Sequence, residues 1–303
     1  MTAPSDTDRR GVLLGAASYV LWGLFPPFFL LLDPAAPAEI LAHRVVWTLV
    51  FMAVVLAVLR GWGALRTLSA RGWAMVVAAA VLIAVNWGLF IYAVGVGHIV
   101  EVALGYYIGP LVSVLIGVLV LHERLRRLQW VAVGIAAAAV LVIAVGDGRV
   151  PWLGLGLAAS FATYGLIKKT VPLPAPASLT AEGVVLAPIA VVYLVVLQLA
   201  GTGTLTGNGA GHIALLVSAG PITAVPLLLY GASARRIPLS VLGTLQYIAP
   251  TLQFLIGVVV YGEAMPAERW VGFGLVWLAL AVFTVDLLRA PARRAAEVPA
   301  EVH

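Results

Sequence analysis

Residues 107–134 read YIGPLVSVLIGVLVLHERLRRLQWVAVG, and residues 247–274 read YIAPTLQFLIGVVVYGEAMPAERWVGFG. The two stretches align without a gap, and 12 of the 28 aligned positions are identical. A second match lies earlier in the chain, because residues 16–18 and 158–160 both read Ala-Ala-Ser. This pattern predicts a chain made of two homologous halves.

The composition places these halves in a membrane. Of the 303 residues, 62% are hydrophobic and only 10% are charged, and the mean hydropathy is +1.07. Soluble globular domains carry about 25% charged residues, so this chain lacks the polar surface that water requires. Cysteine is absent, which excludes disulfides and thiolate chemistry. The lipid bilayer is therefore the expected partner of most of the surface.

A membrane-crossing helix needs about 20 apolar residues, and ten such stretches fit the chain if the connections are short. The first is too long for the core of a signal peptide and lacks a convincing cleavage site, so it is expected to be retained. The ten spans are predicted at 11–32, 38–59, 73–94, 99–120, 128–145, 151–167, 178–199, 212–230, 239–260 and 268–288. Around them we expect a cytoplasmic segment at 1–10, a first half at 11–145, a second half at 151–288 and a disordered cytoplasmic tail at 289–303.

The positive charges follow these spans. With a cytoplasmic N-terminus, 15 of the 18 Lys and Arg residues fall in cytoplasmic segments, whereas Arg149 and Arg269 fall outside and Arg44 lies within a span. Cytoplasmic loops of membrane proteins are enriched in Lys and Arg, so both termini are predicted to be cytoplasmic. This distribution also explains the net charge of +5 without a nucleic-acid partner.

Five spans per half force the second half to lie upside down in the membrane. Glu123 is therefore expected at the cytoplasmic end of its helix, and the equivalent Glu263 at the outer end. Inverted repeats are a recurring plan of secondary transporters, because two similar halves can exchange inward-open and outward-open shapes. Some membrane enzymes and channels are also duplicated, so those functions remain alternatives.

Five motifs in this order resemble the RarD family, which belongs to the EamA-domain branch of the drug/metabolite transporter superfamily. They are 21–26 (LWGLFP), 39–44 (EILAHR), 86–92 (NWGLFIY), 101–110 (EVALGYYIGP) and 246–251 (QYIAPT). The resemblance extends over nearly the whole chain. It implies an all-α membrane protein with ten transmembrane helices in two inverted five-helix EamA repeats, with a central substrate cavity. It also implies a permease of the bacterial inner membrane. Gly109 departs from the family pattern, in which Asn is expected there.

The second predicted span begins with costly polar residues. Glu39 and His43 are four residues apart and share a helix face, and Arg44 lies roughly 9 Å below the outer end of the helix by rise alone. Ionisable groups inside a membrane usually face a bundle interior or a wet cavity. We predict that His43 and Arg44 bind substrate or protons, whereas Glu39 is expected to complement the helix N-terminus.

The fourth predicted span carries a carboxylate above a stripe of small residues, formed by Glu101, Gly105, Gly109, Ser113 and Gly117. Such a stripe lets another helix approach closely. Glu101 is expected at the same depth as His43 and Arg44, so a network between these three side chains is predicted. In this network Glu101 is expected to bind substrate and, if transport is proton-linked, to couple it to protons together with His43.

Further hydrogen-bonding and aromatic residues could line the cavity, as they do in sites for small organic molecules. Interhelical hydrogen bonding is the alternative role of the two glutamines. These residues are Asn86, Trp87, Tyr106, Tyr107, Gln246, Tyr247 and Gln253.

Pro110 and Pro250 occupy equivalent positions inside spans, where each frees a backbone carbonyl and permits a bend. Paired bends suit gating between two conformations. Glu182, in the seventh span, is expected to pack against Lys168 or Lys169.

We therefore predict a secondary transporter that moves a small molecule by alternating access, either proton-linked or by exchange. No Walker sequence and no HExxH motif occurs, so no cofactor or metal is expected. The alternatives are an intramembrane enzyme with His43 as acid/base, a channel or a sensor.

Overall fold

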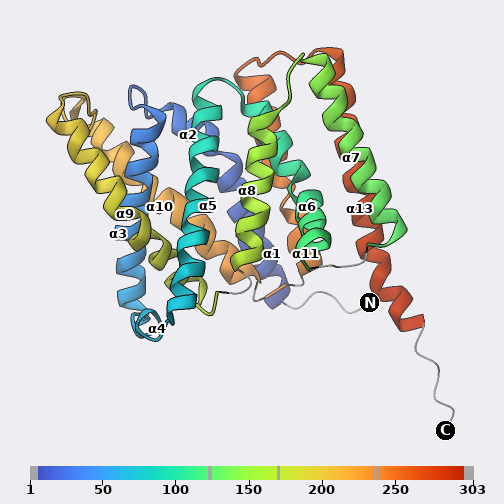
Figure 1. Ribbon diagram of the computed structural model, residues 1–303, viewed down its shortest axis with the longest axis horizontal. Helices are drawn as coiled ribbons and strands as arrows, with labels where there is room; N and C mark the ends of the chain where they lie inside the picture. Colours follow the sequence, from blue (N-terminus) through green and yellow to red (C-terminus); the bar gives the residue numbers. More distant parts are fainter. Residues whose placement is uncertain (1–5, 122–124, 169–170, 235, 238, 297–303) are drawn as a thin grey trace, which may run out of the picture.

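A computed structural model describes residues 6–121, 125–168, 171–234, 236–237 and 239–296 of the chain. Within these ranges every regular element is a helix, which confirms the predicted all-α membrane fold (Figure 1). In chain order the helices are α1 (Asp6–Gly23), α2 (Phe25–Leu30), α3 (Pro37–Val58), α4 (Gly63–Arg66), α5 (Ala70–Gly95), α6 (Ile99–Leu121), α7 (Arg127–Gly146), α8 (Trp152–Lys168), α9 (Ala175–Leu199), α10 (Gly209–Ala234), α11 (Leu239–Leu245), α12 (Ile248–Leu255), the π-helix η1 (Ile256–Val260) and α13 (Ala267–Ala296).

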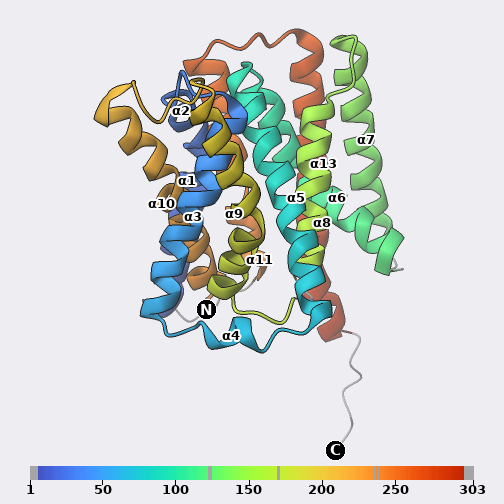
Figure 2. The same cartoon turned by 60° about the vertical axis from the view of Figure 1, so that its left-hand side comes forward.

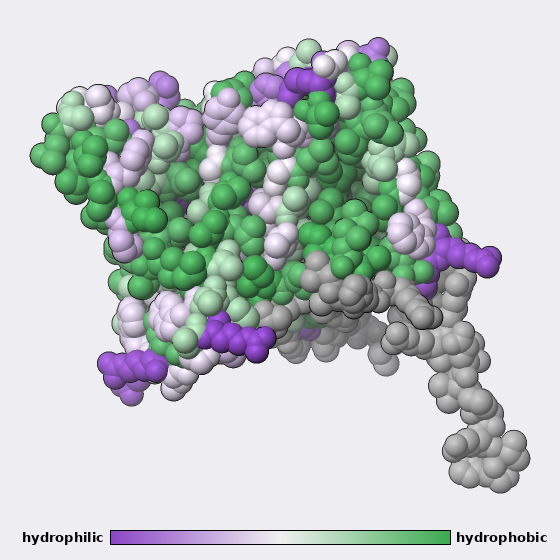
Figure 3. All heavy atoms as spheres, viewed as in Figure 1, coloured by the Kyte–Doolittle hydropathy of each residue, from purple (hydrophilic) through white to green (hydrophobic). Residues whose placement is uncertain are grey.

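The long helices run side by side between two faces of the molecule. We call the face where α1 begins, α4 lies and α13 ends the terminal face, and the opposite face the distal face (Figures 1 and 2). Hydrophobic side chains cover the middle of the surface between them, and hydrophilic ones gather toward its two ends (Figure 3). This banding is what a bilayer requires of a protein that crosses it.

Eight of the described helices are long and apolar enough to cross a membrane. Two further segments would complete the predicted ten. One is α8, which has 17 residues, and the other is the interrupted segment of α11, α12 and η1. The count of ten stays a prediction, because it requires these two segments to cross as well.

Three predicted boundaries differ from the structure. The first span breaks after Gly23, where Pro26 and Pro27 fill the first turn of the separate helix α2. Helix α1 already begins at Asp6, inside the predicted N-terminal segment. Helix α13 continues to Ala296, so the predicted disordered tail is helical up to there; its alanines and arginines favour helix.

The helix contacts repeat between the predicted halves. Helix α6 packs on α8 as α12 packs on α1, and α1 packs on α10 as α8 packs on α5. The pairs α3 with α9 and α7 with α13 join equivalent helices directly. Helix α6 runs toward the terminal face, whereas the segment of α11, α12 and η1 runs toward the distal face (Figure 1). These are the contacts and directions that an inverted repeat requires. The exact boundaries of the halves stay a prediction.

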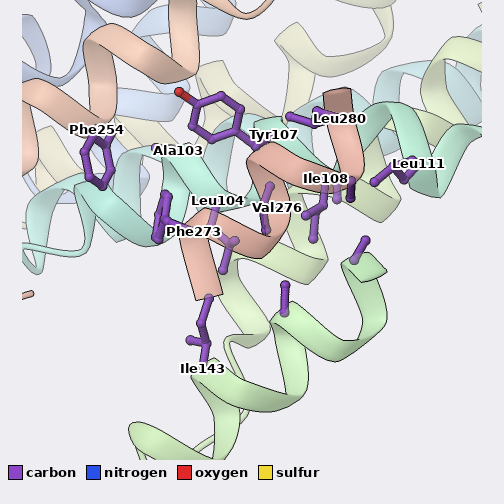
Figure 4. Close-up of a cluster of buried hydrophobic side chains, with 14 of the residues drawn as sticks. Ala103, Leu104, Tyr107, Ile108, Leu111, Ile143, Phe254, Phe273, Val276 and Leu280 are labelled. Carbon is purple, nitrogen blue, oxygen red and sulfur yellow. The ribbon is translucent and has the colours of Figure 1, made fainter. Parts of the chain in front are cut away.

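The largest buried cluster joins α6, α7 and α13, with Phe254 from α12. Figure 4 shows Leu104 and Ile108 of α6 beside Val276 and Phe273 of α13. On another side of α6, a Cβ atom added at Gly105 would lie 2.6 Å from the carbonyl oxygen of Gly154 in α8. The stripe of small residues therefore serves helix packing at Gly105, as predicted.

The two equivalent prolines behave differently. Helix α6 continues through Pro110, whereas the equivalent segment is interrupted at residues 246–247, just before Pro250 in α12. A proline removes the N–H that would bond four residues back, and for Pro250 that partner is the carbonyl of Gln246. The predicted pair of bends is thus realised as a break in one half only.

Candidate functional site

Arg44 lies at the centre of a cage of aromatic rings. It comes from α3 and its exposed fraction is 3%. The guanidinium carbon lies 4.1 Å from the ring centre of Trp87 in α5, and 5.4 and 5.2 Å from the ring centres of Phe25 and Phe29 in α2. Arg44 Nε donates to Thr223 Oγ1 of α10 at 2.9 Å. We call Arg44, Trp87, Phe25, Phe29 and Thr223 the arginine cage.

Asn86 extends the arginine cage by tying three helices together. Its Nδ2 donates to the Leu157 carbonyl and to Ser160 Oγ of α8, both at 3.0 Å. Its Oδ1 accepts from the Tyr106 hydroxyl of α6 at 3.4 Å. The predicted site residues Arg44, Asn86, Trp87 and Tyr106 therefore lie together; the first three are buried and Tyr106 is partly buried.

His43 lies in a second buried group, with Glu39 and His212. His43 Nε2 is 4.0 Å from Glu39 Oε1, and neither of its ring nitrogens makes a hydrogen bond to a described residue. Glu39 accepts from the backbone N–H of Thr204 at 2.6 Å, and the Thr204 hydroxyl contacts His212 Nε2 at 2.9 Å. Glu39 lies in the first turn of α3, where its charge complements the helix N-terminus as expected. Its hydrogen bonds, however, go to Thr204 in the loop before α10.

The predicted network of Glu101 with Arg44 and His43 is wrong, because Glu101 has other partners. Glu101 Oε2 pairs with Arg149 Nη2 at 2.9 Å and with His98 Nδ1 at 3.2 Å. Its Oε1 accepts from the backbone N–H of Leu153 at 3.0 Å, in the first turn of α8. Depth along a helix axis could be estimated from the sequence, but the side of α6 on which Glu101 points could not.

Glu101, from the first predicted half, caps a helix of the second half. Glu263, from the second half, in turn caps a helix of the first half. It accepts hydrogen bonds from the backbone N–H groups of Ile99 and Val100, at 2.5 and 2.9 Å, and so caps α6.

Glu263 also lines a cavity of about 210 Å³ on the distal face, together with Gly97, His98, Val100, Glu101, Leu104, Ile143, Asp147, Pro151, Ala264, Arg269 and Phe273. This cavity lies among α6, α7 and α13. The central cavity expected from the family resemblance stays a prediction. Near Trp87 there is a cavity of about 10 Å³.

We expect Glu263 to make stability depend on pH. Partial burial raises the pKa of this carboxyl above its ordinary value, and the N–H groups of Val100 and Ile99, His98 and Arg269 counteract the rise. A raised pKa in the folded state means that the free energy of unfolding falls as pH increases through that pKa.

Thermal unfolding of the purified protein between pH 4.5 and 7 measures this effect. Glu263→Gln should remove part of the decline, whereas Glu268→Gln, a change at an exposed carboxyl nearby, should leave it. Equal pH profiles for wild type and Glu263→Gln would contradict the prediction.

The remaining predicted site residues make their contacts with residues outside the arginine cage. Tyr107 and Tyr247 stack on each other, with ring centres 6.5 Å apart, and Tyr107 contacts Thr251 Oγ1 at 2.7 Å. Gln246 is half-buried beside them. Gln253 Nε2 donates to the Trp22 carbonyl of α1 at 3.2 Å, so this glutamine makes the interhelical bond that was the alternative to substrate contact.

The predicted contact of Glu182 with Lys168 is confirmed. It lies 2.5 Å from Lys168 Nζ and also accepts from the hydroxyls of Ser178 and Tyr164. Lys169, the other predicted partner, lies outside the described residues.

The sequence did not reveal most of the residues that surround Arg44. Thr223, Phe25 and Phe29 touch Arg44, yet nothing in their local sequence marks them as partners of a residue in another helix. The tight fit of α3 on α10 brings Thr223 into reach, because Gly220 packs against the backbone of Trp47. No group of three or more metal-ligating side chains occurs among the described residues.

Comparison of the sequence with known proteins identifies the family to which the chain belongs. Residues 9–145 match the EamA-like transporter family. Protein RarD of Streptomyces exfoliatus is 51% identical over 97% of this chain and 94% of its own length. Protein RarD of Escherichia coli strain K12 is 43% identical over 92% of this chain and 95% of its own length. The uncharacterized transporter YojE of Bacillus subtilis strain 168 is 45% identical, over 93% and 95% respectively.

A solved crystal structure illustrates the shared fold. It superimposes with a TM-score of 0.60 at 18% identity and covers 92% of this chain and 98% of the other. At that identity the likeness concerns the fold alone. The identities to the RarD proteins, over nearly the full length of each chain, decide the relationship: this chain belongs to the RarD family of EamA-like membrane transporters.

Proposed function

We propose that the protein is a secondary transporter that carries a small organic molecule across the bacterial inner membrane by alternating access. The observation that supports this most strongly is the arginine cage, because it is a buried charged centre built by both predicted halves. Arg44, Trp87, Phe25 and Phe29 come from the first half, and Thr223 from the second. Charged groups inside membrane bundles mark substrate or ion pathways.

The distal face is closed by contacts between the halves. Glu263 caps α6, Glu101 caps α8, and Arg269 pairs with Asp147 at 2.9 Å. The first two contacts join one predicted half to the other, and the third joins the second half to the connection between the halves. In this proposal these contacts separate when the distal face opens, which is the motion that alternating access supplies.

The absence of native cysteine allows a direct test of this motion. A Cβ atom added at Gly257 would lie 3.3 Å from the Cβ of Ile99, close to the separation of about 3.8 Å found in disulfides. The double variant Ile99→Cys/Gly257→Cys should lose substrate counterflow in proteoliposomes when oxidised and regain it on reduction. The two single variants control for the substitutions. Full counterflow in the oxidised double variant would contradict opening at the distal face.

Counterflow also separates transport from the alternatives. A carrier exchanges labelled for unlabelled substrate in a saturable way, a channel does not saturate similarly, and an enzyme changes the compound chemically. The substrate for this assay comes from a stabilisation screen on the purified protein, because a ligand that binds the folded state raises its apparent stability.

Proton coupling, if present, is assigned to His43 in this proposal. Its ring nitrogens make no hydrogen bond to a described residue and a carboxylate lies 4.0 Å away, whereas Glu101 is held by an arginine and a helix N-terminus. His43→Gln should therefore flatten the dependence of transport on pH. An unchanged pH profile would favour exchange without protons.

We further propose that both termini lie in the cytoplasm. Single cysteines at Arg66 on the terminal face and at Ala264 on the distal face should react with a membrane-impermeant thiol reagent from opposite sides. In whole cells only Ala264→Cys is expected to be labelled; labelling of both would contradict the topology.

A further inference from the structure

We infer that the arginine cage is an anion receptor, and that the transported molecule carries a carboxylate on a flat apolar body. This inference rests on the proposed transport function and adds the substrate class. Its starting point is a charge without a counter-charge. Among the described residues, no carboxylate oxygen lies within 4.0 Å of the Arg44 guanidinium, although only 3% of this residue is exposed.

The other ionic groups near the membrane-crossing helices are treated differently. Glu182 has Lys168, Asp286 has Arg126 at 2.6 Å, and Glu101 has Arg149. The cations of these pairs are also more accessible, with 24–41% of each side chain exposed. Arg44 is thus buried more deeply than the cations that do have a partner.

The carboxylate nearest in sequence is already engaged. Glu39 lies little more than one turn before Arg44 on α3, but its Oε1 accepts from the backbone and the hydroxyl of Thr204. Thr223 cannot compensate the charge either, because its hydroxyl is neutral and donates to the Ala219 carbonyl. A buried charge that lacks a partner is costly, so a bound anion would gain more here than at an exposed arginine.

The shape of the cage restricts which anion fits. Trp87 covers one face of the guanidinium, and Thr223 fixes its Nε. The fork of the terminal nitrogens is the part of the group that binds a carboxylate with two parallel hydrogen bonds. An inorganic anion needs several donors around it, whereas the walls here are the rings of Phe25, Phe29 and Trp87. These rings suit the apolar body of an organic acid.

Binding of matched pairs of compounds tests the inference. We would measure thermal stabilisation of the purified full-length protein by phenylacetate against phenylacetamide and by indole-3-acetate against indole-3-acetamide, with chloride and phosphate as further arms. At least one carboxylate should bind about tenfold or more tightly than its amide, because a hydrogen-bonded ion pair is lost in the amide. Equal binding within both pairs, or stronger binding of the inorganic anions, would overturn the inference.

Variants assign the effect to the cage. Arg44→Met removes the charge, Arg44→Lys keeps it without the fork, and Thr223→Val removes the hydroxyl that orients the guanidinium. The preference for carboxylate should vanish in the first and fall in the other two. Arg66→Gln, at an exposed arginine, is the control and should keep it. If Arg44→Met does not fold, an undiminished preference in both Arg44→Lys and Thr223→Val overturns the inference.

Counterflow of the tightest carboxylate then separates the two proposals. Binding that depends on Arg44 without counterflow would refute transport and leave the anion site. Saturable counterflow of neutral compounds at the same rate in wild type and Arg44→Met would refute the anion site and leave transport.

Discussion

Replacing Gly105 by alanine should lower the stability of the protein by about 3 kcal/mol, although alanine is the better helix former. The new Cβ would lie 2.6 Å from the carbonyl oxygen and 3.0 Å from the Cα of Gly154. Both neighbours are backbone atoms, so no side chain can move aside. Helices α6 and α8 would have to separate where the two predicted halves meet.

Gly109, one turn further along α6, provides a matched control. A Cβ atom added there would meet no atom within 4 Å, so Gly109→Ala should gain the helix propensity of alanine and raise stability by about 0.5–1 kcal/mol. The measurement is the midpoint of thermal unfolding, followed by size-exclusion chromatography in detergent. Equal shifts in the two variants would show that α6 and α8 are not in backbone contact.

Glu101→Gln should destabilise the protein by about 2 kcal/mol while leaving the pH dependence of transport unchanged. The substitution removes the ion pair with Arg149 but keeps an oxygen for the N–H of Leu153. Hydrogen bonds to charged groups contribute about 1.5–3 kcal/mol, and the lower part of that range applies because 37% of the Arg149 side chain is exposed.

The variant Arg149→Met and the double variant complete a thermodynamic cycle for this pair. A coupling energy of about 1 kcal/mol is expected if the two side chains stabilise each other. A shift of the transport pH profile in Glu101→Gln, with unchanged stability, would instead return Glu101 to the coupling role suggested by its sequence position.

Much of the fold could be predicted because lipid imposes simple requirements on sequence. Apolar runs of the right length gave the long helices, and the repeat at 107–134 and 247–274 indicated two related halves. The break near Pro250 and the continuous helix through Pro110 could not be told apart in this way. Both sequences permit a bend, and the packing of one particular conformation decides which one bends.

The candidate site was predictable in its first layer only. Arg44 and Trp87 are prominent because a charge and a large ring in apolar helices are costly or unusual. Their contact, and the contact of Arg44 with Thr223, depend on how helices far apart in the chain rotate against each other. Glu101 illustrates the same limit, since its true partner Arg149 lies in a loop that the span pattern treats only as a connection.

The stacked rings of Tyr107 and Tyr247 have a mechanical consequence. They occupy equivalent positions in the repeat, and two equivalent residues can touch only near the axis that relates the halves. In an inverted repeat that axis lies in the plane of the membrane. A rotation of one half against the other about this axis would leave the pair almost at rest and would displace most the residues that lie furthest from it. The contacts of Glu263 with the start of α6, on the distal face, lie further from this axis. A hydrogen bond of ordinary strength at that distance would restrain a large movement.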